Sequence, residues 1–235
     1  MSKLIAVALC LIAGAFAAQR PNPPAGKTIL KVLVEGSSAP PTKSGYNFDF
    51  VGAIGMVFSG SKTLVFDTGV PKQRKALCKA LKNVGVSGKE VTHLVHSHDH
   101  FDHNGNGGMF PNALAYVGTS EIDGYGFKFL AVGKDQPVQI DPNMKLILTP
   151  GHAFGTTDKT LIVDNEATYG RVALVGDLWM DKDDFHAEPD ASQYINQDLV
   201  DSQKKVVCDE KVDYILPGHG PLFQVTSDDR ATLGC

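Results

Sequence analysis

A run of eight residues, HSHDHFDH at positions 96–103, constrains this chain more than any other feature. Four of the eight histidines in the whole sequence lie within it. The apolar segment Val91–Val95 leads directly into the run, which predicts a short buried strand followed by a loop. Imidazole and carboxylate side chains are ligands that suit zinc, iron and manganese, and a chance cluster of this density is a poor explanation. The chain is therefore expected to fold so that other segments converge on this loop.

Within the run, the spacing His-x-His-x-Asp-His fits one register, formed by His98, His100, Asp102 and His103. A start at His96 would place His100 where the Asp is required, so His96 is left out. Two imidazoles two residues apart in an extended loop can face one metal ion. The adjacent Asp and His can then face a second ion nearby. These four residues are too few for two ions, and further ligands must come from elsewhere.

Three further candidates follow apolar segments later in the chain, at predicted strand ends. They are His152 in LTPGHAFGTTD, Asp177 in ALVGDLW and His219 in ILPGHGP. Each comes directly after a glycine, which lets the backbone turn tightly and approach a site closely. Taken singly, each has an ordinary explanation as a turn or surface residue. Taken together after the histidine run, they predict two divalent metal ions, with zinc as the first expectation and iron or manganese as alternatives.

Apolar segments alternate with turns from Ile29 onward and predict an α/β fold. Helices are expected over 72–84, where Pro71 suits a first turn, and over 192–207. The order of strands, helix, strand and loop, followed by strands, helix and strand, indicates two similar α/β halves packed sheet to sheet with helices outside. Strands are expected at 29–35, 54–58, 63–66, 91–95, 113–117, 145–148, 160–163, 172–175 and 214–216.

The first residues have the pattern of a secretory signal peptide. Lys3 is followed by the apolar run Leu4–Phe16 and by small residues that form an Ala-x-Ala site. We expect residues 1–18 to be the signal peptide, residues 19–235 to be a single domain, and the mature protein to be secreted and free of the membrane. Cys10 would leave with the signal, and the remaining cysteines, Cys78, Cys208 and Cys235, allow at most one internal disulfide, whose pairing stays open.

Electrostatics argue against strong non-specific binding to nucleic acid. The sequence has 22 Lys and Arg residues against 26 Asp and Glu, a formal net charge of −4, and no basic block stands out. A nuclease whose basic residues are confined to its cleft is not excluded by this balance. A homodimer is compatible with the expected helix faces, although nothing in the sequence marks them.

The ordered set of motifs resembles the metallo-β-lactamase superfamily over nearly the whole mature chain. The resemblance implies a four-layer αββα sandwich of two mixed sheets with helices outside. His98, His100 and His152 would hold the first metal, while Asp102, His103 and His219 would hold the second. Asp177 would bridge both ions, and Asp67 in VFDTG would orient the ligand loop without binding metal. The flanking segments HFDHNGNGGMFPNA, TPGHAFGTTDKTLIV and GDLWMDKDDF are similar to the family of metallo-β-lactamase domain-containing protein 1.

A site of this kind implies hydrolysis by a metal-bridging hydroxide, with Asp102 and Asp177 as the catalytic residues. The resemblance favours phosphodiester bonds of RNA or nucleotides and an endoribonuclease-like activity. The alternatives are a secreted acyl hydrolase of the thioesterase or lactonase type, acting on a small-molecule ester, and a metal-binding protein without turnover.

We expect loops near 125–129, 154 and 179–186 to form the rim of the cleft. Its candidate contacts are Phe154, Trp179 and Phe185 for stacking, Lys128 for an anion, and His93, His96 and His186 behind the ligands.

Overall fold

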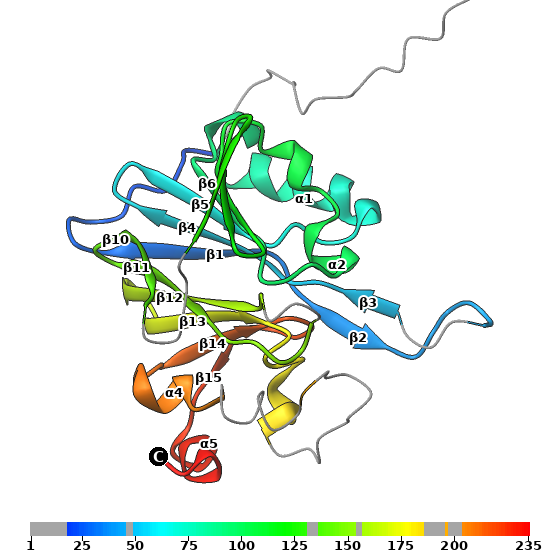
Figure 1. Ribbon diagram of the computed structural model, residues 1–235, viewed down its shortest axis with the longest axis vertical. Coiled ribbons are helices and arrows are strands. Elements are labelled where there is room, and N and C mark those ends of the chain that lie inside the picture. Colours follow the sequence, from blue (N-terminus) through cyan, green and yellow to red (C-terminus); the bar gives the residue numbers. More distant parts are fainter. Residues whose placement is uncertain (1–17, 46–48, 131–135, 154–156, 186–195, 197–203) are drawn as a thin grey trace, which may run out of the picture.

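The computed structural model describes residues 18–45, 49–130, 136–153, 157–185, 196 and 204–235. Two β-rich halves lie face to face (Figure 1). The N-terminal half contains β1 (Thr28–Val34), β2 (Ser37–Ala39), β3 (Asp49–Val51), β4 (Ile54–Ser59), β5 (Lys62–Phe66), α1 (Arg74–Asn83), β6 (His93–Val95), α2 (Phe101–Asn104), β7 (Leu114–Val117), β8 (Ser120–Asp123) and β9 (Gly126–Phe129). The C-terminal half contains β10 (Val138–Asp141), β11 (Met144–Leu148), β12 (Lys159–Glu166), β13 (Gly170–Gly176), α4 (Val206–Asp209), β14 (Tyr214–Pro217), β15 (Phe223–Gln224) and α5 (Ser227–Leu233).

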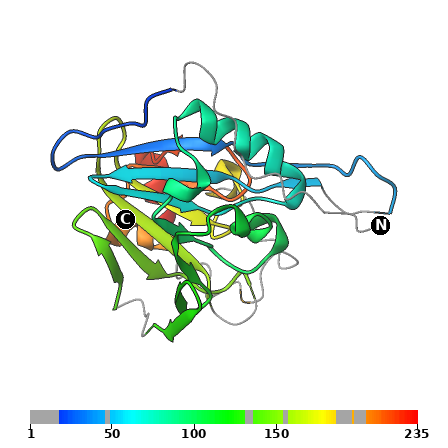
Figure 2. The same ribbon diagram turned by 90° about the horizontal axis from the view of Figure 1, so that it is seen from above.

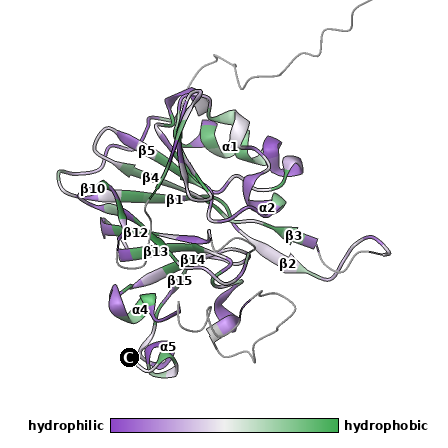
Figure 3. Ribbon diagram, in the orientation of Figure 1, coloured by the Kyte–Doolittle hydropathy of each residue, from purple (hydrophilic) through white to green (hydrophobic). Residues whose placement is uncertain are grey.

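Side-chain alternation along the strands divides the interior into layers. In β4, Ile54 and Met56 point toward α1, whereas Val57 points toward the other half. In β13, Leu174 joins the core between the halves, whereas Val175 packs outward with α4. This period of two is what a strand buried on both faces requires. The result is the expected four-layer α/β arrangement, with α1 outside one sheet (Figure 2) and the more polar residues gathered on the outer elements (Figure 3).

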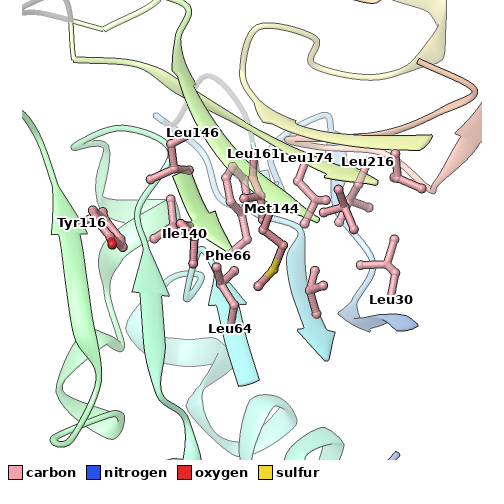
Figure 4. Close-up of a cluster of buried hydrophobic side chains, with 14 of the residues drawn as sticks. Leu30, Leu64, Phe66, Tyr116, Ile140, Met144, Leu146, Leu161, Leu174 and Leu216 are labelled. Atoms are coloured by element: carbon pink, nitrogen blue, oxygen red, sulfur yellow. The ribbon is translucent and has the colours of Figure 1, made fainter. Parts of the chain in front are cut away.

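The central core lies between the two sheets (Figure 4). Leu64 and Phe66 of β5 meet Leu146 and Leu161 of the opposite half there, and all four side chains are buried. Each fully buried Leu or Phe contributes roughly 1.5–3 kcal/mol to stability, so this core holds the halves together. Hydrogen bonds also link the halves: the N–H of Ala53 donates to the Gly218 carbonyl at 2.7 Å, and β1 pairs with β12 in parallel at Thr28 and Glu166. The two expected sheets are therefore continuous through this one pairing.

Parallel pairing aligns the strand ends that carry the predicted ligands. β5 pairs in parallel with β6, and β13 pairs in parallel with β14. Because the carboxyl ends of parallel strands meet at one edge, the loops that follow them emerge together. Among the described residues, no helix is both long and apolar enough to span a membrane. The expected helix over 192–207 falls largely outside the described residues, which include α4 at its end.

One disulfide pairing that the sequence left open is resolved. Cys208 in α4 is bonded to Cys235 after α5, at a sequence separation of 27 residues. The bond fixes the C-terminal helix to the outer layer of the second half. Arg230 of α5 reinforces this attachment by donating to the carbonyl of Val212 at 2.6 Å.

Candidate metal centre

The seven predicted ligands all lie in segments that follow the carboxyl ends of strands. His98, His100, Asp102 and His103 follow β6, and the last two belong to the short helix α2. The remaining three come from the second half of the chain, where His152 follows β11, Asp177 follows β13 and His219 follows β14. The site thus takes ligands from both halves, and residues far apart in the sequence meet at one edge of the fold.

The structure brings these side chains together in two groups whose donor atoms lie within 4.8 Å of one another. The first group is His98, His100, His152 and Asp177, and the second is Asp102, His103 and His219. All are buried except His100, which is half-buried. This grouping agrees with the division between two metals that the family resemblance implied.

Asp177 lies between the two groups. Its Oδ2 atom is 3.2 Å from His152 Nε2 in the first group and 3.3 Å from His219 Nε2 in the second. Its Oδ1 atom is 3.1 Å from His103 Nε2. A carboxylate with two oxygens aimed at both groups can bridge two cations.

The ligand nitrogens face one another at short distances, an arrangement that suits coordination of a metal ion better than hydrogen bonding between imidazoles. His152 Nε2 lies 3.0 Å from His100 Nδ1, and His103 Nε2 lies 3.4 Å from His219 Nε2. His98 Nε2 is buried and has no hydrogen-bond partner in the described part of the chain. A buried polar atom left unpaired costs about 1–3 kcal/mol, and coordination of an ion would remove that cost. The two His and Asp groups are consistent with a dinuclear metal site.

Asp67 supports the ligands from behind, as the resemblance implied. Its carboxylate accepts hydrogen bonds from the backbone N–H of Ser97 at 2.6 Å, from Ser97 Oγ at 2.8 Å and from His103 Nδ1 at 2.8 Å. His219 is oriented similarly, since its Nδ1 donates to the carbonyl of Val51 at 3.2 Å. When Nδ1 carries the proton, Nε2 presents its lone pair to the metal position.

Charge within the centre shifts the protonation equilibria of its members. Burial alone would lower the pKa of His103, but the nearby carboxylates of Asp177 and Asp67 hold this pKa well above its usual value. Burial would raise the pKa of Asp177, but the surrounding His103, His219 and His98 keep it well below its usual value. The pKa of His98 is lowered mainly by burial. In the metal-free state Asp177 is therefore ionised and His103 protonated at neutral pH, and His103 must lose its proton when a metal binds.

Several predicted rim contacts fall elsewhere. Trp179 was predicted to stack on a substrate, and this is wrong: its side chain is 0% exposed and packs in the outer core of the second half. Lys128, predicted as an anion contact, pairs with Glu121 at 2.7 Å.

The histidines predicted to lie behind the ligands are outside both metal groups where they are described. His93, at the start of β6, forms hydrogen bonds with Thr92 and with Lys62. His96 is buried next to the ligand loop but also lies outside both groups. Phe154, His186 and the side chain of Phe185 lie outside the described residues.

Sequence reasoning missed several residues that shape the centre. The ring of Phe50 in β3 packs against His219 with centroids 4.7 Å apart. Phe101, which stands between two ligands in the sequence, is 69% exposed at the surface of the metal loop. Gly52 has no room for a side chain, because a Cβ there would lie 2.2 Å from the carbonyl oxygen of Asp102. The glycine was visible in the sequence, but its close approach depends on how β3 and α2 meet.

Solved structures of low sequence identity share the fold. A putative metallo-β-lactamase of Thermotoga maritima superposes with a TM-score of 0.63 at 19% identity, over 84% of this chain and 99% of the other. A quorum-quenching N-acyl homoserine lactone lactonase superposes with a TM-score of 0.60 at 20% identity, over 82% and 91% of the two chains. At these identities the similarity establishes the fold alone.

Proteins found by sequence similarity share a higher sequence identity with this chain than those solved structures do. The chain is 35% identical over 167 residues to human metallo-β-lactamase domain-containing protein 1, covering 69% of this chain and 59% of the human protein. The Xenopus laevis protein of the same name is 31% identical over 198 residues, covering 83% of this chain and 80% of that protein. An uncharacterised Caenorhabditis elegans protein is 29% identical over 194 residues, covering 78% of this chain and 51% of its own length. The chain thus spans little more than half the length of the nematode and human proteins.

The family model described as the metallo-β-lactamase superfamily matches residues 48–231, a range that contains every predicted ligand. The fold, the order of the motifs and the two ligand groups agree with this match. On these grounds the chain belongs to the metallo-β-lactamase superfamily.

Proposed function

We propose that this metal-dependent hydrolase of the metallo-β-lactamase superfamily holds two zinc ions and cleaves phosphodiester bonds, as an endoribonuclease or a nucleotide phosphodiesterase. The observation that carries the dinuclear site is the convergence of seven His and Asp side chains in two buried groups with Asp177 between them. Two divalent ions held by these residues would supply hydroxide at neutral pH and would stabilise negative charge on the scissile group.

The chain's own residues have distinct roles in this proposal. Asp177 holds the two ion positions in register through its two oxygens. Asp102 Oδ2 lies 3.4 Å from His219 Nε2 and 3.6 Å from His103 Nε2, so this carboxylate borders the second metal position. A carboxylate in that place can accept a proton during turnover. Asp67 keeps His103 oriented but does not reach the reacting atoms.

Charge balance favours a phosphodiester over a neutral substrate. Two divalent cations against the carboxylates of Asp102 and Asp177 and one hydroxide, with the imidazoles neutral, would leave the centre with one net positive charge. A positive, mostly buried centre attracts an anionic phosphodiester and stabilises the further charge that develops as the bond breaks. The sequence similarity to the family of metallo-β-lactamase domain-containing protein 1 supports the same substrate class.

An acyl ester, thioester or lactone is the second candidate, because apolar side chains flank the ligands. Phe101 is 69% exposed beside His100, and Phe50 lies against His219. An acyl chain would find an apolar contact in Phe50, and the exposed Phe101, the sequence neighbour of His100, is a second candidate contact; exposed aromatic side chains also stack bases. An N-acyl homoserine lactonase of Bacillus cereus is 26% identical over 145 residues, covering 56% of this chain.

The deciding experiment is metal analysis followed by a substrate panel. Wild-type protein, His100→Ala and Asp177→Ala are analysed for metal content and assayed on RNA, bis-p-nitrophenyl phosphate, thioesters and lactones. We expect about two metals per chain in the wild type, fewer in both variants, and turnover of the phosphodiesters. Turnover of lactones or thioesters alone would replace the first candidate by the second. Metal uptake without turnover on any panel would leave a metal-binding protein, and no uptake would overturn the proposal.

We propose that the protein is exported. The leader pattern of residues 1–18 and the Cys208–Cys235 disulfide both support this, since such bonds persist in oxidising compartments. Expression in eukaryotic cells and N-terminal analysis of protein in the medium provide the test. Recovery of a chain that begins near residue 18 or 19 is expected, whereas retention of the intact chain inside the cell would contradict export.

A further inference from the structure

The loop that carries His152 is held by a buried carboxylate that the proposed chemistry does not use. Asp158 Oδ2 accepts hydrogen bonds from three consecutive backbone N–H groups, those of Gly151 at 2.9 Å, His152 at 3.1 Å and Ala153 at 3.1 Å. The Asp158 side chain is 6% exposed. Three amides that converge on one anionic oxygen form a charge-assisted cradle, which fixes the backbone more firmly than neutral hydrogen bonds do.

Backbone hydrogen bonds of Asp158 and of the next residue, Lys159, contact both ligand loops of the first group. The backbone N–H of Thr149 donates to the Asp158 carbonyl at 2.8 Å, and the N–H of Lys159 donates to the Ser97 carbonyl at 2.8 Å. Ser97 immediately precedes His98. The start of β12 therefore connects the loop of His152 to the loop of His98.

Small errors in the His152 backbone would move its imidazole out of the group. His152 Nε2 lies 3.0 Å from His100 Nδ1 and 3.2 Å from Asp177 Oδ2, so little free space surrounds it. Gly151 has a φ of 139°, a conformation that side chains rarely adopt, and it supplies one of the three amides. Because the three amides include that of His152 and those of both its neighbours, the carboxylate is well placed to decide where His152 points.

We propose that Asp158 is a positioning residue, whose carboxylate fixes the backbone of His152 and so holds its imidazole at the first metal position. This inference rests on the metal site of the proposed function. It assigns Asp158 no contact with substrate and no proton transfer. Its effect is on the affinity and geometry of the first site, while the second site, formed by Asp102, His103 and His219, is left intact.

Glu166 offers a matched control elsewhere in the fold. It is also a buried carboxylate, 3% exposed, and it also accepts from three backbone N–H groups, those of Leu30 at 3.0 Å, Thr168 at 2.6 Å and Tyr169 at 2.7 Å. It belongs to neither metal group. Asp158→Asn and Glu166→Gln therefore remove the same kind of interaction, but only the first is next to a ligand.

The test is a titration of metal-free wild type, Asp158→Asn and Glu166→Gln with Zn²⁺ against a chromophoric chelator, repeated with Co²⁺ while the visible spectrum is recorded. We expect Asp158→Asn to bind one ion normally and the other about 10–100-fold more weakly, with an altered Co²⁺ spectrum. Glu166→Gln should keep both affinities and the wild-type spectrum. Wild-type behaviour of Asp158→Asn, or an equal loss in Glu166→Gln, would overturn the assignment. Wild type that binds no metal would overturn the proposed function as well.

A second measurement needs no variant and remains decisive if Asp158→Asn does not fold. Hydrogen exchange in the metal-free wild type reports directly on the amides of Gly151, His152 and Ala153. Slow exchange at all three is expected, because each N–H is bonded to Asp158 before any metal arrives. Exchange at the rate of an unprotected loop would show that the carboxylate does not hold the ligand backbone.

Discussion

Asp67 shows how one residue can shape the centre without binding metal. It has a positive φ of 59°, which places its carboxylate under the ligand loop, where it receives hydrogen bonds from Ser97 and His103. Asn is among the residues that tolerate this backbone conformation best. Replacement of Asp67 by Asn therefore changes the charge of the side chain while it preserves the backbone.

We predict that Asp67→Asn weakens metal binding at the second group about 10–100-fold, because His103 loses its carboxylate partner and becomes a less basic ligand. Competition titration of the metal-free variant with Zn²⁺ measures the effect. Asp164→Asn is the control, since Asp164 pairs with Arg171 away from the centre. Unchanged affinity in Asp67→Asn would mean that His103 does not depend on Asp67.

Lys159 gives a second prediction at the residue scale, on stability. Its side chain is 1% exposed, and burial lowers its pKa from 10.5 to about 8. Below pH 8 the lysine is protonated in both states, and the cost of burying its charge is fully present. Between pH 8 and 10.5 the unfolded chain retains more protons than the native chain, so the free energy of unfolding rises with pH, by up to about 3 kcal/mol.

Urea unfolding of wild type and Lys159→Met at pH 7.5 and 9.5 checks this prediction. The variant loses hydrogen bonds from Nζ to the carbonyls of Gly118 and Thr157, a loss that does not vary with pH. The variant should therefore show a smaller gain in stability between the two pH values than the wild type. Equal gains would show that Lys159 does not titrate in this range.

At the scale of elements, α4 and α5 depend on the covalent link between them. α4 spans four residues and α5 spans seven, lengths at which an isolated helix is unstable in water. The N-cap Thr226 of α5 accepts from the N–H of Asp229 at 3.2 Å and stabilises its first turn. The Cys208–Cys235 bond closes a loop of 27 residues around them.

Cys235→Ser should lower the free energy of unfolding by about 3.5 kcal/mol, the loop-closure entropy that a bond of this span removes from the unfolded chain. Denaturant unfolding of oxidised protein measures the loss. Under reducing conditions the wild type should approach the variant, and this comparison is the control. A difference that persists after full reduction would trace the effect to packing of the Cys235 side chain.

The elements that the sequence predicted correctly, among them β1, β6, β7, β11 and β14, contribute side chains to the buried cores. β4, β5, β12 and β13 are of this kind, as is α1 with its buried Leu77 and Leu81. β2, β3, β8 and β9 were missed because they are short and partly or fully exposed, and even the alternation of Phe127 and Phe129 in β9 spans only four residues. The prediction that Trp179 stacks on a substrate was wrong because its closeness to Asp177 in the sequence did not reveal which way its side chain points.

At the scale of the whole molecule, the metal centre connects the two halves. His98 and His103 belong to the first half, and His152 and His219 belong to the second. An ion bound only by the folded state stabilises it by RT ln(1 + [L]/Kd), about 2.7 kcal/mol at a free concentration of 100 Kd. The motif order revealed this ligand set, but the distances between groups depended on packing of the halves.

Chelation of the metals should therefore lower the unfolding temperature in calorimetry, and added Zn²⁺ should restore it. His100→Ala should respond less to chelator, because it has lost a ligand of the first group. His93→Gln is the control, since His93 lies outside both groups, and its response should equal that of the wild type. An unfolding temperature that is independent of chelator would contradict a metal link between the halves.

The parts of the centre become available at very different times during synthesis. His98 and His219 are separated by 120 residues of the sequence. A growing chain cannot complete the second metal group until β14 has emerged, because His219 follows that strand, whereas the first group requires the chain only as far as Asp177. Capture of an ion by the second group would therefore follow the folding of both halves. The ions available where folding finishes would then influence the choice of metal as much as the ligand set does.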